Sequence, residues 1–265
     1  MKRFFAQCYI WLLLIILYAP IVFIAVFSFT ESKVLGNWTG FSTKLYSNLF
    51  TGNMQGTGSL MTAIENTLLI ALIAAVVSTA LGTIAAIGLH NMRGRGKQVI
   101  TFMNNIPMLN PDIITGVSLF LLFVFLHISQ GYVTVVLAHI TFCTPYVVLS
   151  VLPKLTQMNP NIYEAALDLG CTPVQAFFKV KLPNIMPGVL SGFVMAFTLS
   201  LDDFVITYFT RGSQFQTLPI QIYTMTHQRI NPKANALSAL LFVAILLILI
   251  LINIRNNKEA EKSRA

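Results

Sequence analysis

The chain has 265 residues, of which 55% are hydrophobic and only 10% are charged. Soluble domains carry about 25% charged residues, so this deficit indicates a protein whose solvent is the lipid bilayer. The formal net charge is +8, but the basic residues cluster between hydrophobic runs rather than beside aromatic residues. We therefore interpret the charge as a determinant of membrane topology and not as a nucleic-acid surface.

Six apolar runs predict six transmembrane helices, because each approaches or exceeds the ~20 residues that span a hydrocarbon core. The runs are continuous rather than alternating, which favours helices over the strands of a barrel. The expected spans are 9–29, 62–89, 99–126, 131–152, 184–210 and 236–254. The first run is too long for a cleaved signal peptide. The sequence thus predicts an all-α polytopic protein, with residues 1–265 forming a single transmembrane domain.

The distribution of lysine and arginine predicts the orientation of these spans. With the N-terminus in the cytoplasm, twelve of these residues lie inside and five outside. The short loop at 90–98 contributes Arg93, Arg95 and Lys97 to the inner side. Both termini are therefore expected in the cytoplasm, and the protein in the plasma (inner) membrane. The long segment 153–183 is then cytoplasmic.

Cofactor and metal chemistry is not expected from this sequence. The three cysteines form no CxxC pair, and the four histidines lack metal-ligand spacing. The chain also contains no GxxxxGK[ST] phosphate loop, so we expect no ATP hydrolysis by this protein alone. Nothing in the pattern of serine, histidine and aspartate indicates a nucleophile with its base, and an enzyme is not expected.

Residues 159–183 predict two short helices inside the cytoplasmic segment. The first is expected to start at Asn161, with Glu164 three residues on in a capping-box pattern, and to end at Gly170. The second is expected to start at Thr172 and to stop at Leu182-Pro183. The apolar positions are Ile162, Ala165, Ala166 and Leu169 on the first helix and Val174, Phe177 and Phe178 on the second. Such a hairpin either lies in the membrane interface or is a knob offered to a cytoplasmic partner.

The pattern Glu164-Ala165-Ala166-x-x-x-Gly170, then nine residues and Val180-x-Leu182-Pro183, resembles the EAA signature of binding-protein-dependent ATP-binding-cassette (ABC) importer permeases. The usual isoleucine is Val180 here. The resemblance implies a six-helix type I (MetI-like) permease core. It also implies that Glu164, Ala165, Ala166 and Gly170 belong to a coupling helix that docks into the ATPase subunit.

The resemblance further implies the partners and the mechanism. They are two copies of an ATP-binding subunit, a homologous second permease and an extracytoplasmic substrate-binding protein, working by alternating access. The stretches 139–146 and 197–203 look most like permeases of spermidine/putrescine importers. Permeases for iron, thiamine or an oxyanion share the EAA segment and stay open as alternatives.

Four acids fall within or at the edges of the expected spans: Glu65, Asp112, Asp202 and Asp203. No lysine or arginine lies inside a span to pair with them, and a charged acid near the bilayer centre costs on the order of 3 kcal/mol. We expect them along a watery path for a cationic substrate such as a polyamine, which argues against an anion importer.

Each acid also has a plainer interpretation. Asp202 and Asp203 are also compatible with a helix cap or an interhelical hydrogen bond. Asp112 follows Asn110-Pro111 in a span expected to be broken or kinked, and it is also compatible with a helix start. Glu65 is also compatible with a position at the membrane interface. In other classes of protein, the same acids fit an ion-coupled secondary transporter or an intramembrane enzyme that pairs Asp112 with Asp203.

Overall fold

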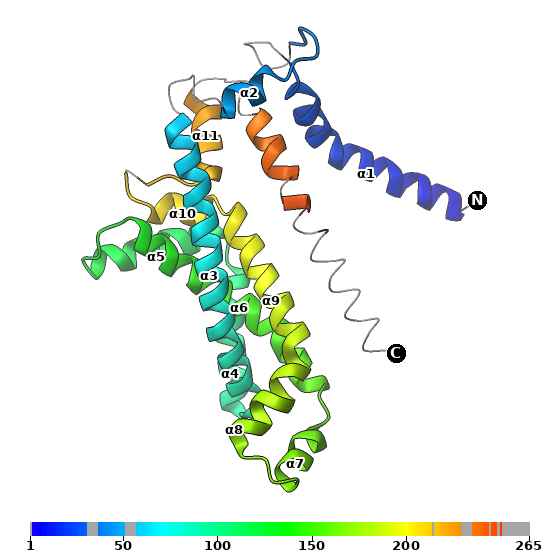
Figure 1. Ribbon diagram of the computed structural model, residues 1–265, viewed down its shortest axis with the longest axis vertical. Helices are drawn as coiled ribbons and strands as arrows, with labels where there is room; N and C mark the ends of the chain where they lie inside the picture. The colour runs from blue at the N-terminus through cyan, green and yellow to red at the C-terminus, as the bar shows by residue number, and fades with distance from the viewer. Residues whose placement is uncertain are drawn as a thin grey trace. The chain divides into compact units, whose positions relative to one another are not determined.

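The computed structural model describes residues 2–30, 37–50, 57–213, 215–228, 235–243, 245–247 and 250 (Figure 1). Within these ranges the regular structure is helical, with one isolated β-bridge between Thr30 and Phe41. The expected all-α fold is confirmed. The chain divides into two compact units, Met1–Met61 with Gln221–Ala265, and Thr62–Ile220, which are described separately. That the whole chain forms one transmembrane domain stays a prediction.

The first unit holds α1 (Lys2–Phe27), α2 (Lys44–Phe50) and a shorter apolar helix at Asn235–Leu247. In α1 the 21-residue span Gln7–Phe27 has no residue buried within the protein. An apolar helix exposed on all sides suits contact with lipid or with another membrane protein. The end of α1 is tied to α2 by a hydrogen bond of 2.7 Å between the Ser28 and Tyr46 hydroxyls.

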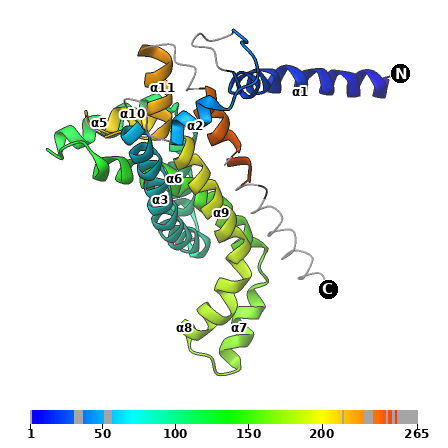
Figure 2. The ribbon, with the colours of Figure 1, turned by 45° about the horizontal axis from the view of Figure 1, so that its top comes forward.

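The second unit contains the long helices and the candidate site. Its helices are α3 (Thr57–Asn91), α4 (Arg95–Leu109), α5 (Asp112–Phe125), α6 (Tyr132–Gln157), α7 (Pro160–Asp168), α8 (Pro173–Ala176), the π-helix η1 (Phe177–Lys181), α9 (Leu182–Asp202), α10 (Val205–Thr210) and α11 (Leu218–Gln228). Residues 57–61 of α3 and residues 221–228, most of α11, belong to the first unit. Figures 1 and 2 both show α6 and α9 running side by side.

Four described helices are long and apolar enough to cross a membrane, or five if the bent pair α4–α5 counts as one span. Three of them, Gln7–Phe27, Met61–Asn91 and Tyr132–Gln157, match the expected spans at 9–29, 62–89 and 131–152. The sixth expected span, 236–254, extends outside the described residues, and its described part is shorter than a full span. Six spans are therefore not confirmed.

The third expected span, 99–126, is broken, as its proline pattern predicted. Helices α4 and α5 meet at Asn110-Pro111 with a bend of 106°. Asn110 is extended, with a ψ of 139°, because the ring of Pro111 disfavours helical backbone in the residue before it. Asp112 then begins α5.

The limits expected for the fifth span, 184–210, are wrong at both ends. The helix starts at Pro173 and runs through α8, η1 and α9 to Asp202 without interruption, over 30 residues. Pro183 does not stop it, because the preceding π-turn, in which the Leu182 amide donates to the Phe177 carbonyl, adds one residue to the turn and so accommodates the missing amide and the ring of the proline. At the other end α9 stops at Asp202, and α10 continues the chain in a new direction.

Small residues allow α9 to approach α6 closely. The buried stripe of α9 toward α6 has small residues four positions apart: Gly188, Gly192, Ala196 and Ser200. A Cβ atom at Gly188 would lie 2.7 Å from Lys154 Cγ and 3.0 Å from the Ser150 carbonyl oxygen, and one at Gly192 would lie 3.1 Å from Val147 Cγ1. Helix pairs in membranes pack through such small-residue stripes, because apolar contact alone offers no gain over lipid.

Candidate functional site

Two helix breaks come together in the second unit. Helix α5, which follows the break at Asn110-Pro111, packs against α10, which follows the break after Asp202. Their contact is closest at buried Gly116, where a Cβ atom would lie 3.0 Å from Phe209 and 3.3 Å from the Cα atom of Ile206. Broken membrane helices expose polar backbone groups, so they are tolerated where protein or a watery cavity receives those groups.

Asp203 lies in the break between α9 and α10 and caps α10. Its carboxylate accepts hydrogen bonds from the Ile206 amide at 3.3 Å, the Thr207 amide at 2.8 Å and the Thr207 hydroxyl at 2.7 Å. Its side chain is 8% exposed. A capping carboxylate satisfies amides that the first helical turn leaves without partners. Asp203 therefore has the geometry of a helix cap, which is the plainer of its two interpretations.

His139 on α6 joins α9, α10 and Asp203. Its ring, 1% exposed, has Nδ1 2.6 Å from the Ser200 hydroxyl and Nε2 2.8 Å from the Thr207 hydroxyl. The Thr207 hydroxyl already donates to Asp203, so it accepts from Nε2–H, and the Ser200 hydroxyl donates to Nδ1. This assignment satisfies both nitrogens of a neutral imidazole. Nε2 also lies 3.4 Å from the Asp203 carboxylate.

The sequence interpretation missed His139, since it searched histidines only for metal-ligand spacing. In the part of the chain that the structure describes, no group of three histidine, cysteine or acidic residues is placed to hold a metal ion. One signal was available. A histidine in the middle of an apolar run needs hydrogen-bond partners, and Ser200 and Asp203 are polar residues of another span. The small-residue stripe at Gly188 and Gly192 was also readable as a GxxxG pattern.

The other three acids are exposed. Asp202 ends α9, Asp112 begins α5 and Glu65 lies on α3. Asp112 begins α5, which packs against α10, and Asp202 ends α9, which leads into α10. Among the described residues, no lysine or arginine forms an ion pair with any of the three. The structure thus places Asp112 and Asp202 at the two helix breaks, where both are exposed, whereas the carboxylate of Asp203 is occupied by hydrogen bonds to α10.

The cytoplasmic segment forms a hairpin with well-defined caps. The first helix, α7, starts at Pro160 and is capped by Asn159, whose side chain accepts from the Asn161 amide at 3.0 Å, so the expected start at Asn161 is wrong. Asn159 precedes a proline at the first helical position, a stronger start signal than the capping-box spacing we used.

The turn between the two helices matches the sequence expectation. Gly170 has a φ of +88°, its amide donates to the Leu167 carbonyl, and the Cys171 amide donates to the Ala166 carbonyl. These two bonds define a Schellman motif, which requires a residue able to adopt left-handed backbone. Thr172 and Gln175 then form the expected capping box, with bonds of 3.2 and 3.3 Å.

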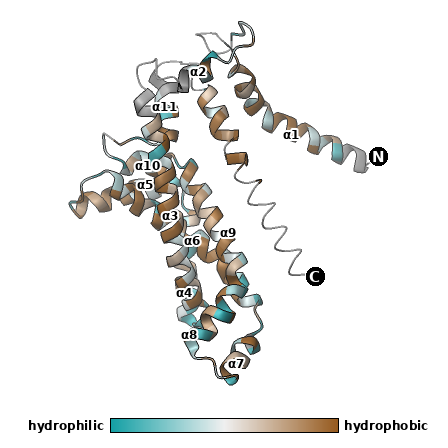
Figure 3. Ribbon diagram, viewed as in Figure 1, coloured by the Kyte–Doolittle hydropathy of each residue, from teal (hydrophilic) through white to brown (hydrophobic). Residues whose placement is uncertain are grey.

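The hairpin exposes most of its apolar side chains. Ala166 is buried, but Leu169 is 86% exposed, Val174 66% and Phe178 60%. Glu164 and Ala165 are exposed as well. Inside the hairpin, Lys181 Nζ lies 5.7 Å from the centre of the Tyr163 ring, a cation–π contact that joins α7 to η1. Figure 3 shows hydrophilic and hydrophobic residues interspersed along α7 and α8.

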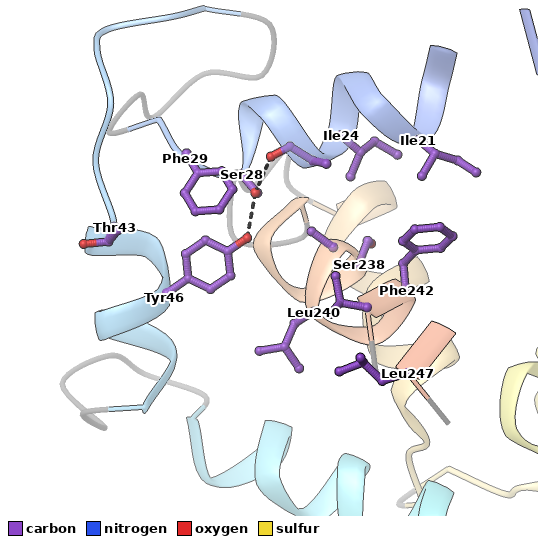
Figure 4. Close-up of a pocket in the computed structure, with 13 residues that line it drawn as sticks. Ile21, Ile24, Ser28, Phe29, Thr43, Tyr46, Ser238, Leu240, Phe242 and Leu247 are labelled. Carbon is purple, nitrogen blue, oxygen red and sulfur yellow. Dashed lines mark hydrogen bonds between the residues drawn. The ribbon is translucent and has the colours of Figure 1, made fainter. Parts of the chain in front are cut away.

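A large apolar pocket lies elsewhere, in the first unit (Figure 4). It measures about 790 Å³ and lies between α1, α2 and Asn235–Leu247. Its wall is almost wholly apolar, and the Ser28–Tyr46 hydrogen bond lies at one side. None of the site residues expected from the sequence lines it.

Comparison with known proteins gives a consistent result. Residues 78–256 match the family model described as "Binding-protein-dependent transport system inner membrane component". The chain is 42% identical over 236 residues to the putrescine transport system permease protein PotI of Escherichia coli (strain K12), covering 86% of this chain and 82% of that protein. It is 36% identical over 252 residues to the spermidine/putrescine transport system permease protein PotC of Haemophilus influenzae, covering 95% and 96%.

Solved structures show the same fold at lower identity. A bacterial ABC transporter that imports the acidic polysaccharide alginate matches with a TM-score of 0.70 at 15% identity, covering 97% of this chain and 96% of that chain. The inward-facing MetNI methionine ABC transporter matches with a TM-score of 0.66 at 18% identity, covering 77% and 99%.

Proposed function

The chain belongs to the binding-protein-dependent transport system inner membrane components, the ABC importer permeases, and from that premise we propose that it moves polyamines into the cytoplasm. Members of this family are multi-pass membrane proteins of transport systems that include an ATPase, a substrate-binding protein and a second permease. This protein is therefore a transport permease. The substrate proposal is supported by two relatives whose names specify putrescine or spermidine, at 42% and 36% identity over most of the chain.

The exposed acids favour a cationic substrate. Asp202 and Asp112 come from two helix breaks that pack together, and both carboxylates are exposed without an ion-pair partner among the described residues. A polyamine carries several ammonium groups, which would neutralise such carboxylates in the low dielectric of a membrane path. We assign Asp202 and Asp112 to that path, with Glu65 also along it. Asp203, which we expected there, has its carboxylate occupied by α10, and we assign it to holding the break.

The hairpin of α7 and α8 is the proposed docking element for the ATPase. Its capped ends make it rigid, and its exposed apolar side chains suit a groove in a partner protein. We propose Glu164, Ala165 and Gly170 as docking residues on its surface. Ala166, buried against the hairpin itself, supports that surface from behind. Two ATPase copies would serve this permease and a homologous second permease, and a binding protein would deliver substrate outside.

The proposed orientation places both termini in the cytoplasm. It also places the hairpin, with Lys179 and Lys181, on the same inner side as Arg93, Arg95 and Lys97. His90 lies at the end of α3, directly before the loop that holds Arg93, Arg95 and Lys97. A shared basic end is the arrangement that the positive-inside rule favours.

Uptake by the reconstituted complex tests the substrate assignment. Labelled spermidine would be offered to proteoliposomes containing this permease, its second permease, the ATPase and the binding protein, with putrescine, thiamine or ferric iron as competitors. We expect putrescine alone to compete. Absence of spermidine uptake, or competition by thiamine or iron, would contradict the polyamine assignment. Uptake without a bound ATPase would instead indicate an ion-coupled secondary transporter.

A further inference from the structure

We infer that His139 is a positioning residue for transport, which holds the elbow between α9 and α10 so that Asp202 keeps a fixed place in the path. The inference rests on the proposed role of Asp202 in that path. His139 is buried and has no access to the path itself, so its effect would be transmitted through the residues that it contacts.

The geometry of the elbow supports this role. Residues Asp203 and Phe204 join the two helices, and a two-residue connection has several backbone conformations unless its surroundings fix it. On one side of the elbow, His139 Nδ1 contacts Ser200 in the last turn of α9. On the other side, Nε2 contacts Thr207 in α10. One rigid ring thus spans the junction and sets the distance between the two helix ends.

The ring itself is firmly placed. It lies on α6, which packs along α9 through the small-residue stripe that ends at Ser200. Its edge meets the Phe142 ring at a centroid distance of 5.3 Å and an interplanar angle of 70°. A buried network in which each member has a partner is costly to rearrange, because a displaced polar group would lose its bond without gaining water.

The consequence for transport lies in the position of Asp202. This residue is the last of α9, two positions after Ser200, and its neighbour Asp203 is held by α10. The backbone of Asp202 can therefore move only if one of the two helix ends moves. Because Asp112 begins the helix that packs against α10, the same ring also restrains the separation of the two backbone positions that carry the exposed carboxylates.

Two matched pairs of variants probe the network in the reconstituted complex. His139→Leu removes both bonds, whereas His139→Gln keeps one donor and one acceptor. Thr207→Val removes the hydroxyl with little change in shape, whereas Thr207→Ser keeps it. We expect His139→Leu and Thr207→Val to lower the number of polyamine molecules moved per ATP several-fold, with assembly and ATPase turnover unchanged. The Gln and Ser variants should retain most of the transport.

A double-mutant cycle with Asp202→Asn separates positioning from general damage. If His139 acts through Asp202, His139→Leu should cause little further loss in the Asp202→Asn background. If His139→Leu lowers transport by the same factor in the wild-type and the Asp202→Asn backgrounds, the inference is overturned, while the proposed role of Asp202 in the path is unaffected. Full transport by Asp202→Asn alone would remove the proposed path role, and the inference with it. If the His139→Leu variant does not assemble, a double-mutant cycle of Thr207→Val with Asp202→Asn tests the inference in the same way.

Discussion

The packing of α3 against α6 depends on Gly82, where a methyl group has no room. A Cβ atom there would lie 2.7 Å from both Cβ and Cγ1 of Val147 and 3.1 Å from the Thr144 carbonyl oxygen. The Val147 Cβ atom and the Thr144 carbonyl oxygen cannot move aside by a change of rotamer. Gly88, two turns along the same helix, has no atom within 4 Å of the position of its Cβ.

Gly82→Ala should therefore destabilise the protein, whereas Gly88→Ala should not. Overpacking of a well-packed interface costs ~1–3 kcal/mol. At Gly88 the only effect is the helix propensity of alanine, which favours folding by about 0.5–1 kcal/mol. The two variants carry the same chemical change on the same helix, so the propensity effect cancels and the difference between them, about 1–3 kcal/mol, isolates the close approach.

The free energy of unfolding in mixed micelles, titrated with a denaturing detergent, measures this difference. Gly82→Ala should shift the midpoint to lower detergent and Gly88→Ala should leave it equal or higher. Equal midpoints for the two variants would refute the helix contact at Gly82. A double variant, Gly82→Ala with Val147→Ala, should recover part of the loss, because the shorter side chain at 147 removes the clash with Cγ1.

Three further predictions concern the hairpin and the elbow. Gly170→Val should weaken ATPase binding, because the φ of +88° at position 170 strains a β-branched residue by about 1–2 kcal/mol. Gly170→Asn should bind nearly normally, since asparagine tolerates left-handed backbone. Pull-down of the ATPase measures both variants. In a Cys8→Ser background, Cys171 should react with an impermeant maleimide in inside-out vesicles only, and labelling from outside would contradict the orientation. Asp203→Ala should lower the free energy of unfolding by about 2 kcal/mol or more, because α10 loses its cap. Asp202→Ala should change it little, because that side chain is exposed. Thermal melts in detergent would measure the difference.

Features set by neighbouring residues were predictable from the sequence. The lengths of the apolar runs located three spans within a few residues, because burying a helix in lipid requires only a continuous apolar stretch. The cap at Thr172 and Gln175 and the left-handed turn at Gly170 followed from bonds between residues at most five positions apart. The bend at Asn110-Pro111 likewise follows from the steric demand of one ring.

Features that depend on a partner from another helix were not predictable. Pro183 was expected to stop a helix, but the π-turn before it accommodates its missing amide and its ring inside a continuous helix. The roles of Asp202 and Asp203 could not be separated, since adjacent acids have the same local pattern. Only the tertiary structure placed His139, 61 residues before Ser200, against the junction of α9 and α10. At this junction the Asp203 carboxylate is hydrogen-bonded and buried, whereas the Asp202 carboxylate is exposed. The membrane-spanning character is thus a local property of the sequence. The role of each acid in or beside a span is instead set by the helix that packs against it.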